Sequence, residues 1–315
     1  MATWNYATVG GGHSNGAGGN YATSAGGDSN VAQGSYPTVG GGQSNGASGN
    51  YATVGGGYTN AAGPNAATTV AGGWSNWASG DTATVGGGGA NLASGNHSTV
   101  PGGDSNTAQG AYAFAAGRLA RAIQDGTFVW ADSGDAEFAS IGANSFNARV
   151  SGGARFVNSG GTGVQLAAGG NAWAATSDRA AKEHFVPVDA RAILQRLVSL
   201  PVETWNLKSQ DPAIRHIGPM AQDFAAAFAV GEDDTHISTI DADGVAFAAI
   251  QGLYQLVQDQ NAQLAGRQEQ LTAQQEQLAA QDTEIAALKN SVATQEARRQ
   301  ALEARLAALE QAAGQ

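Results

Sequence analysis

The chain contains no cysteine and only three lysines, Lys182, Lys208 and Lys289. The absence of cysteine excludes disulfide bonds and metal sites with thiolate ligands. No apolar run approaches the length of a membrane span, and residues 1–4 lack the basic and apolar parts of a secretory signal peptide. We therefore expect no membrane insertion and no signal peptide in this chain, so display on a surface needs another route.

Charge is also scarce, because charged residues make up 13% of the chain and the net charge is -11. A phosphate backbone selects basic stripes, and none is visible, so we expect no nucleic-acid partner. We expect no metal and no cofactor either. The 46 glycines lie almost entirely before residue 176, whereas the part of the chain after it is rich in Ala, Leu, Gln and Glu. The two parts of the chain are therefore interpreted separately.

Residues 6–126 repeat every 15 residues, with one shift by a single residue after the fourth unit. Two of the units read YATVGGGHSNGAGGN and YPTVGGGQSNGASGN. Each joins a β-prone Y-A-T-V piece to a glycine corner and a Ser-Asn-x-Ala-x-Gly second leg, which predicts one coil of a β-solenoid. The expected inward side chains are alanines and Val9, Val39, Val54, Val70 and Val85.

One such coil buries little apolar surface against an ordering entropy of about 1–2 kcal/mol per residue, so the roll should need partners. The spacing G-x-S-N-x-A-x-G-x-Y-A-T-V-G resembles the head repeats of trimeric autotransporter adhesins. That resemblance implies a left-handed β-roll whose chains pack three together. The unit here is one residue longer than usual in that family, and the membrane anchor is missing. The resemblance therefore supports the fold and the trimerisation more strongly than the cellular role.

Three other interpretations of the repeats are glycine-rich disorder, a calcium-binding roll and an ice-binding solenoid. The strict register disfavours disorder. The runs at 26–28 and 102–104 do not reproduce the G-G-x-G-x-D pattern of calcium-binding rolls. A recurring threonine fits an ice-binding face, but threonine is also a good strand former.

The variable positions of the unit are where a ligand surface would lie. The eighth position holds Trp74, and Trp77 follows at the eleventh position of the same unit. Aromatic side chains on a rigid polar roll suit stacking on sugar faces, so this pair is a candidate surface for a cell-surface glycan or receptor. Trimer packing and chance are the alternatives.

Residues 127–176 alternate apolar and polar side chains between glycine-rich turns, which predicts a β-rich connector of short strands. Asp132, Asp135 and Glu137 lie there. A carboxylate pair would suit glycosidic chemistry, and a glycan-degrading tail spike is a third class of function, but Asp-Ser-Gly-Asp is more often a solvated turn.

The stretch ATSDRAAKEH, residues 175–184, holds the first lysine of the chain. Locally, Ser177 followed by an acid and helix formers predicts a helix N-cap. Serine attacks when a base takes its proton, and Lys182 can do so once burial lowers its pKa. Ala180, Ala181, Phe185 and Val186 are the apolar residues that could surround it.

Three segments then follow in order: SDRAAKEHFVPVDARAILQRLVSLPVETWNLK, RHIGPMAQDFAAAF and DADGVAFAAIQGLYQLV. Residues 177–257 resemble the C-terminal intramolecular chaperone and autoprotease domain of phage endosialidases, tail spikes and tail fibres. The resemblance implies a Ser-Lys dyad that cleaves the chain after trimer formation, with Ser177 as nucleophile, Lys182 as general base and Thr176-Ser177 as the scissile bond. Residues next to the dyad depart from the family, and His216 is more often a structural partner than a catalytic one.

An apolar residue recurs every seven residues from Ile250, and the line three residues later is mostly polar. This pattern predicts a coiled coil whose polar core positions reduce stability in favour of register or oligomer choice. Three strands fit the roll, although the pattern also allows two.

The sequence thus predicts a β-roll over 1–126, a β-rich connector over 127–176, an α+β chaperone autoprotease over 177–257 and a coiled coil over 258–315. The expected function is that of a homotrimeric tail-fibre or adhesin-like protein, on a virion tail or bacterial surface. Its enzymatic activity is a single self-cleavage. The alternative is a non-cleaving structural adhesin in which the C-terminal domain is a permanent trimerisation stalk.

Overall fold

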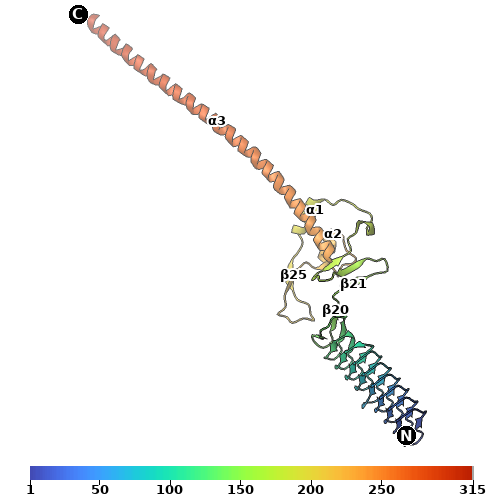
Figure 1. The fold of residues 1–315 in the computed structure, drawn as a ribbon. Helices are drawn as coiled ribbons and strands as arrows, with labels where there is room; N and C mark the ends of the chain where they lie inside the picture. The colour runs from blue at the N-terminus through green and yellow to red at the C-terminus, as the bar shows by residue number, and fades with distance from the viewer. Residues whose placement is uncertain (314–315) are drawn as a thin grey trace. The chain divides into compact units, whose positions relative to one another are not determined.

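The computed structural model describes residues 1–313. The chain forms two compact units, one from Met1 to Asp178 and one that begins at Arg179 (Figure 1). None of the helices within residues 1–313 combines the length and the apolar character that a membrane span needs.

The first unit is a β-solenoid in which each repeat adds one short strand to each of two parallel sheets (Figure 1). The first sheet takes the pairs that begin with the repeated threonine, which is followed by valine in all of them except β3: β1 (Thr8–Val9), β3 (Thr23–Ser24), β5 (Thr38–Val39), β7 (Thr53–Val54), β9 (Thr69–Val70), β11 (Thr84–Val85) and β13 (Thr99–Val100). The second takes the pairs after the repeated asparagine: β2 (Gly16–Ala17), β4 (Val31–Ala32), β6 (Gly46–Ala47), β8 (Ala61–Ala62), β10 (Trp77–Ala78), β12 (Leu92–Ala93) and β15 (Thr107–Ala108). The predicted mainly β fold of the N-terminal half is confirmed.

Neighbouring coils are in register along the roll, with Val39 paired to Val54 and Val85 to Val100. From β1 to β13 the single longer step lies between β7 and β9, because six residues, 63–68, connect β8 to β9 where five, 48–52, connect β6 to β7. The extra residue is accommodated in the turn, and both sheets continue past it without a break.

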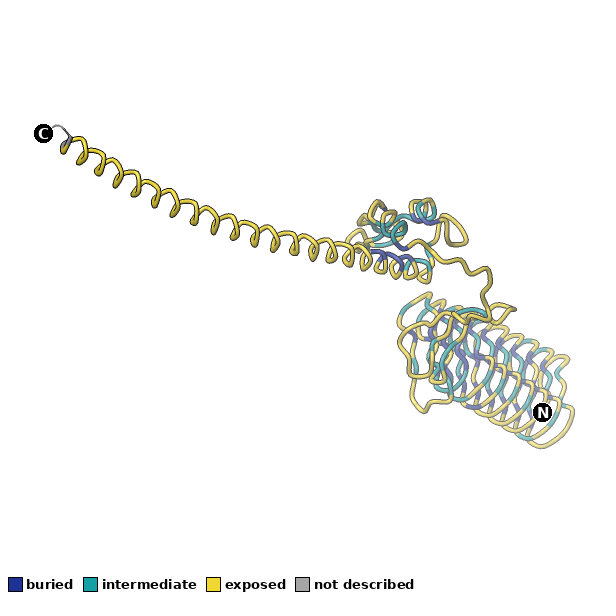
Figure 2. Tube along the Cα trace, turned by 90° about the horizontal axis from the view of Figure 1, so that it is seen from above, coloured by how far each residue is buried: buried dark blue, intermediate teal, exposed yellow. Residues whose placement is uncertain are grey.

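The interior of the roll contains alanine and valine together with a column of asparagines that the sequence interpretation did not place there. Figure 2 shows the buried residues along the inside of the stacked coils. The Asn60 amide donates to the carbonyl oxygens of Gly56 and Gly73, both at 2.8 Å, and its Oδ1 accepts the N–H of Asn76 at 3.0 Å. The same bonding recurs along the column, which satisfies turn carbonyls that would otherwise lack partners. Its members are Asn15, Asn30, Asn45, Asn60, Asn76, Asn91 and Asn106.

Both parallel sheets continue beyond residue 126, where the regular repeat ends. The strands beyond that residue are β18 (Phe128–Ala131), β19 (Phe138–Ala139) and β20 (Phe146–Arg149). The same sheets also contain β14 (Gly103–Asp104), β16 (Phe114–Arg118) and β17 (Ala120–Ala122), which lie before it. A separate antiparallel sheet follows, made of β21 (Ala154–Val157), β22 (Gly163–Leu166) and β23 (Trp173–Ala175). Part of the expected connector is therefore solenoid.

The second unit is a small α/β fold followed by one long helix. Its elements are the 3-10 helix η1 (Arg179–Ala181), α1 (Ala190–Val198), β24 (Glu203–Trp205), β25 (His216–Gly218), α2 (Ala221–Phe228) and α3 (Thr239–Ala313). β24 and β25 form a two-stranded antiparallel sheet. A small core joins Leu200, Phe224, Phe228 and Val245, so α2 and the start of α3 enclose it. The 75-residue helix α3 runs unbroken through the domain boundary expected at residue 257.

Candidate functional site

The predicted cleavage segment begins where the antiparallel sheet of the first unit ends. Thr176 follows β23, and its N–H donates to Gly163 O at 2.9 Å. Its hydroxyl donates to the same oxygen at 3.1 Å and accepts the Gly163 N–H at 3.2 Å. Thr176 is thus anchored to β22, on the acyl side of the predicted scissile bond. The next residue, Ser177, is exposed and lines a cavity of about 250 Å³ in the same unit.

The predicted general base lies in the second unit. Lys182 directly follows η1 and is exposed. The expected apolar surroundings are not formed by this single chain, since Phe185 is 55% exposed and the Arg179 guanidinium lies 4.5 Å from its ring centre. The structure thus describes Ser177 at the end of the first unit and Lys182 near the start of the second.

Ser177 is followed by less helix than the N-cap prediction implies. Only the three-residue η1 follows it, and the first α-helix begins at Ala190, where the Asp189 side chain accepts the N–H groups of Arg191 and Ala192. Pro187 lies between the two positions, and the residue before a proline favours extended backbone. The first α-helix of this unit therefore starts at Ala190, 13 residues after Ser177.

Comparison with family models identifies the second part of the chain. Residues 177–230 match the family described as chaperone of endosialidase. This match confirms the resemblance and supports a tail-fibre or endosialidase-type protein with a chaperone domain. A search of the curated proteins finds no match.

The match begins at the predicted nucleophile, Ser177, and covers α1, β24, β25 and α2 of the chaperone domain. His216 lies on β25, where its ring packs on Trp205 with ring centres 4.8 Å apart and Nε2 lies 2.9 Å from Gln210 Oε1. These contacts give this histidine a structural role. All of α3 lies outside the matched residues.

The chaperone domain holds α1 against α3 at a glycine. A Cβ at Gly252 would lie 2.8 Å from the Ala190 carbonyl carbon and 3.2 Å from Arg191 N. Next to this close approach, Arg191 donates to Gln255 Oε1 at 3.1 Å and pairs with Asp259 Oδ2 at 2.6 Å. The glycine allows the helices to approach, and the arginine fixes their register.

In the roll, the two tryptophans of the candidate ligand surface are both about half exposed, at 54% for Trp74 and 49% for Trp77. The Trp74 indole lies over Gly89 of the next coil, because a Cβ there would be 2.5 Å from Cε2 and 2.8 Å from Cζ2 of the ring. Trp77 lies on β10, and its Nε1 donates to Gly63 O at 3.0 Å. Contacts with the neighbouring coils therefore fix both rings.

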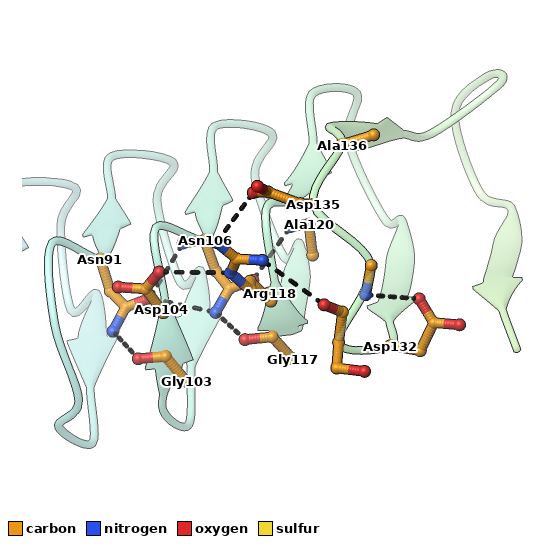
Figure 3. Close-up of polar contacts among 12 residues, drawn as sticks. Asn91, Gly103, Asp104, Asn106, Gly117, Arg118, Ala120, Asp132, Asp135 and Ala136 are labelled. Atoms are coloured by element: carbon orange, nitrogen blue, oxygen red, sulfur yellow. Dashed lines mark hydrogen bonds and ion pairs between the residues drawn. The ribbon is translucent and has the colours of Figure 1, made fainter. Parts of the chain in front are cut away.

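The carboxylates near the end of the roll pair with arginines. Arg118 contacts Asp135 at 2.8 Å and Asp104 at 3.7 Å, which links neighbouring coils (Figure 3). Arg121 contacts Glu137 at 2.7 Å. These ion pairs favour a structural role over an acid pair for glycosidic chemistry.

Asp132 is held more tightly than the other carboxylates. It accepts the hydroxyl and the N–H of Ser151 at 2.5 and 2.7 Å, and it pairs with Arg149 Nε at 2.8 Å. These donors, Ser151 foremost, lower the pKa of the Asp132 carboxyl well below its ordinary value. A carboxylate kept ionised in this way is unsuited to general-acid chemistry at neutral pH.

Proposed function

We propose that this protein is a homotrimeric tail-fibre or adhesin-like surface-binding protein whose C-terminal chaperone aligns three chains and is then released by cleavage at Thr176-Ser177. The observation that carries the proposal is the chaperone-of-endosialidase match, which begins at Ser177. A thin solenoid built from near-identical coils has many registers of similar energy. A folded nucleus that aligns the chains first avoids slow searching among those registers.

The cleavage chemistry uses two residues of the chain. Ser177 Oγ attacks the Thr176 carbonyl carbon while Lys182 takes the hydroxyl proton. The C–N bond breaks as Lys182 passes this proton to the Ser177 nitrogen, which leaves as an amine, and water then hydrolyses the Thr176 ester on Oγ. Lysine serves as a base only when burial lowers its pKa, and Lys182 is exposed in the single chain. Burial by neighbouring copies explains why cleavage would await assembly, after which loss of the nucleus traps the trimer kinetically.

A denaturing gel with intact mass measurement of freshly expressed protein tests self-cleavage. We expect wild-type protein to give fragments 1–176 and 177–315, and we expect Ser177→Ala and Lys182→Ala to stay intact because each removes one member of the dyad. Lys208→Ala is the matched control and should cleave like wild type. An intact wild-type chain would support the alternative, a permanent trimerisation stalk.

We propose further that Trp74 and Trp77 bind a saccharide of the target cell surface. Their support from Gly89 and Gly63 fixes the rings before binding, so little side-chain entropy is lost when a sugar stacks on them. Each ring removed should weaken glycan-array binding about tenfold, which corresponds to about 1.4 kcal/mol. Trp130→Ala, on a tryptophan outside the pair, is the control. Binding that survives in the Trp74→Ala, Trp77→Ala double variant contradicts this assignment.

A further inference from the structure

Helix α3 has one face covered by its own chain. The covered residues are Val245, Ala248, Ala249 and Gly252, which contact the small core and the start of α1. Arg191 of α1 extends this contact to Asp259. After Gly252 no residue of α3 up to Glu310 is buried, since every residue from Leu253 to Glu310 is exposed.

A second, apolar face of α3 is exposed along nearly its whole length. At 3.6 residues per turn it is rotated by about 130° from the covered face, so packing of α1 leaves it free. Ile250 is 63% exposed and Leu264 is 61% exposed, although both are large apolar side chains. We call this face the exposed stripe, and its apolar members are Ile250, Leu253, Val257, Leu264, Leu271, Leu278, Ile285, Leu288, Val292, Leu302, Leu306 and Leu309.

The charges that flank the exposed stripe favour one arrangement of partner helices. Consider two parallel helices of equal register. The residue directly before each core position of the seven-residue line lies opposite the residue on the neighbouring helix whose number is higher by five. This rule places Glu284 opposite Lys289, Arg298 opposite Glu303 and Arg305 opposite Glu310. All three pairs are attractive.

An antiparallel arrangement lacks this complementarity. In antiparallel helices, the residues that directly follow the second core position of each heptad face one another. Five such residues lie in the range 282–310, and four of them are acidic. Like charges opposite each other oppose association. The charge pattern therefore distinguishes the two orientations on the same apolar face.

We propose that the exposed stripe binds other copies of this chain in a parallel, in-register coiled coil that begins at Ile250, beside α1, rather than after the chaperone domain. The domain core and the coiled coil thus share the first turns of α3, so alignment of the helices also aligns the chaperone domains. The number of chains, three, rests on the proposed function, whereas orientation and register rest on the exposed stripe and its flanking charges.

The polar core positions of the same face explain how one register is selected. Gln260, Arg267, Gln274 and Gln281 interrupt the second apolar line. Matching glutamine amides across the chains can bond to one another, whereas a shift by seven residues would place Gln281 opposite Leu288 and Gln295 opposite Leu302 and bury these amides unpaired. These polar positions lower the stability of the coiled coil and favour one register.

The absence of cysteine allows a direct test by disulfide formation in the full chain. A residue in the core of a parallel, in-register assembly faces its own copy in the neighbouring chain. We therefore expect Leu264→Cys and Ile285→Cys each to form disulfide-linked dimers in high yield under mild oxidation, on a non-reducing gel. Thr283→Cys, on the outer face two residues from Ile285, should remain largely unlinked.

Two positions are needed because an antiparallel pair can bring at most one of them opposite itself. Linkage at only one position, or linkage at Thr283→Cys equal to that at Ile285→Cys, would overturn the proposal. If the chain cleaves itself, the C-terminal fragment carries the cysteine and gives the same result. An uncleaved but linked chain would reject self-cleavage and leave the coiled coil intact.

Discussion

Asn60→Ala is expected to lower the free energy of unfolding of the roll by about 2–4 kcal/mol. The substitution removes the donor for Gly56 O and the acceptor for the Asn76 N–H, and each group left without a partner costs about 1–3 kcal/mol. Gly73 O is less affected, because it keeps the N–H of Tyr58 at 2.9 Å. In a solenoid each coil contacts only its neighbours, so the defect weakens the interface on both sides.

Urea unfolding followed by far-UV circular dichroism measures this loss. Gln43→Ala is the control, because that side chain is exposed and makes a single long hydrogen bond, 3.5 Å, to Asp28. It should change the unfolding free energy by less than about 0.5 kcal/mol. Equal midpoints for the Asn60 and Gln43 variants would show that the asparagine column does not stabilise the roll.

The repeated pattern allowed the coils and their inward valines to be predicted, but not the asparagine column. The sequence analysis placed this asparagine in the second leg of the coil and assigned no buried role to it. The available signal was that asparagine recurs at the same place in every unit before residue 112 while its neighbours vary, as at Asn45 and Asn60. A polar side chain kept at one position among varied ones indicates bonding to the backbone.

The end of the solenoid was hidden by its changing period. The outward threonine column continues as Phe114, Phe128 and Phe146, whose rings stack at 4.7 and 4.8 Å. These residues are spaced unequally, so a search at a fixed period misses them. Pairing of backbone strands does not require equal loops, and the last coils vary in their turns.

The chemistry of the candidate site follows from sequence more readily than its geometry. Ser177 and Lys182 were identified by a motif, and the family match begins at the first of them. The activity of that lysine depends on burial, which the residues next to it in sequence do not provide. In the proposed assembly, contacts between copies would supply such burial, and a local pattern carries little information about contacts between chains.

Gly57→Ala and Gly46→Ala are expected to have effects of opposite sign. Gly57 has a φ of +92°, and a Cβ there would lie 2.7 Å from Asn60 Nδ2, 2.9 Å from Gly73 N and closer still to Gly73 O. Backbone strain and overpacking each cost about 1–3 kcal/mol, so alanine at this corner should destabilise the roll by about 3–5 kcal/mol.

At Gly46, a Cβ would meet no atom within 4 Å. Its partners in the neighbouring coils are Val31 and Ala61, so side chains already occupy this column. Alanine here should stabilise the roll by about 0.4–1 kcal/mol, because it restricts the unfolded chain. Both variants are measured by urea unfolding beside wild type.

The comparison separates two reasons for glycine in the repeat. If both variants destabilise the roll equally, a general need for glycine outweighs local geometry, and the corner assignment fails. If they differ in sign, the corner glycine is required because the next coil approaches it within contact distance. The column of Gly46 then remains free to carry the side chains that differ from coil to coil, as Trp77 of the candidate ligand surface does.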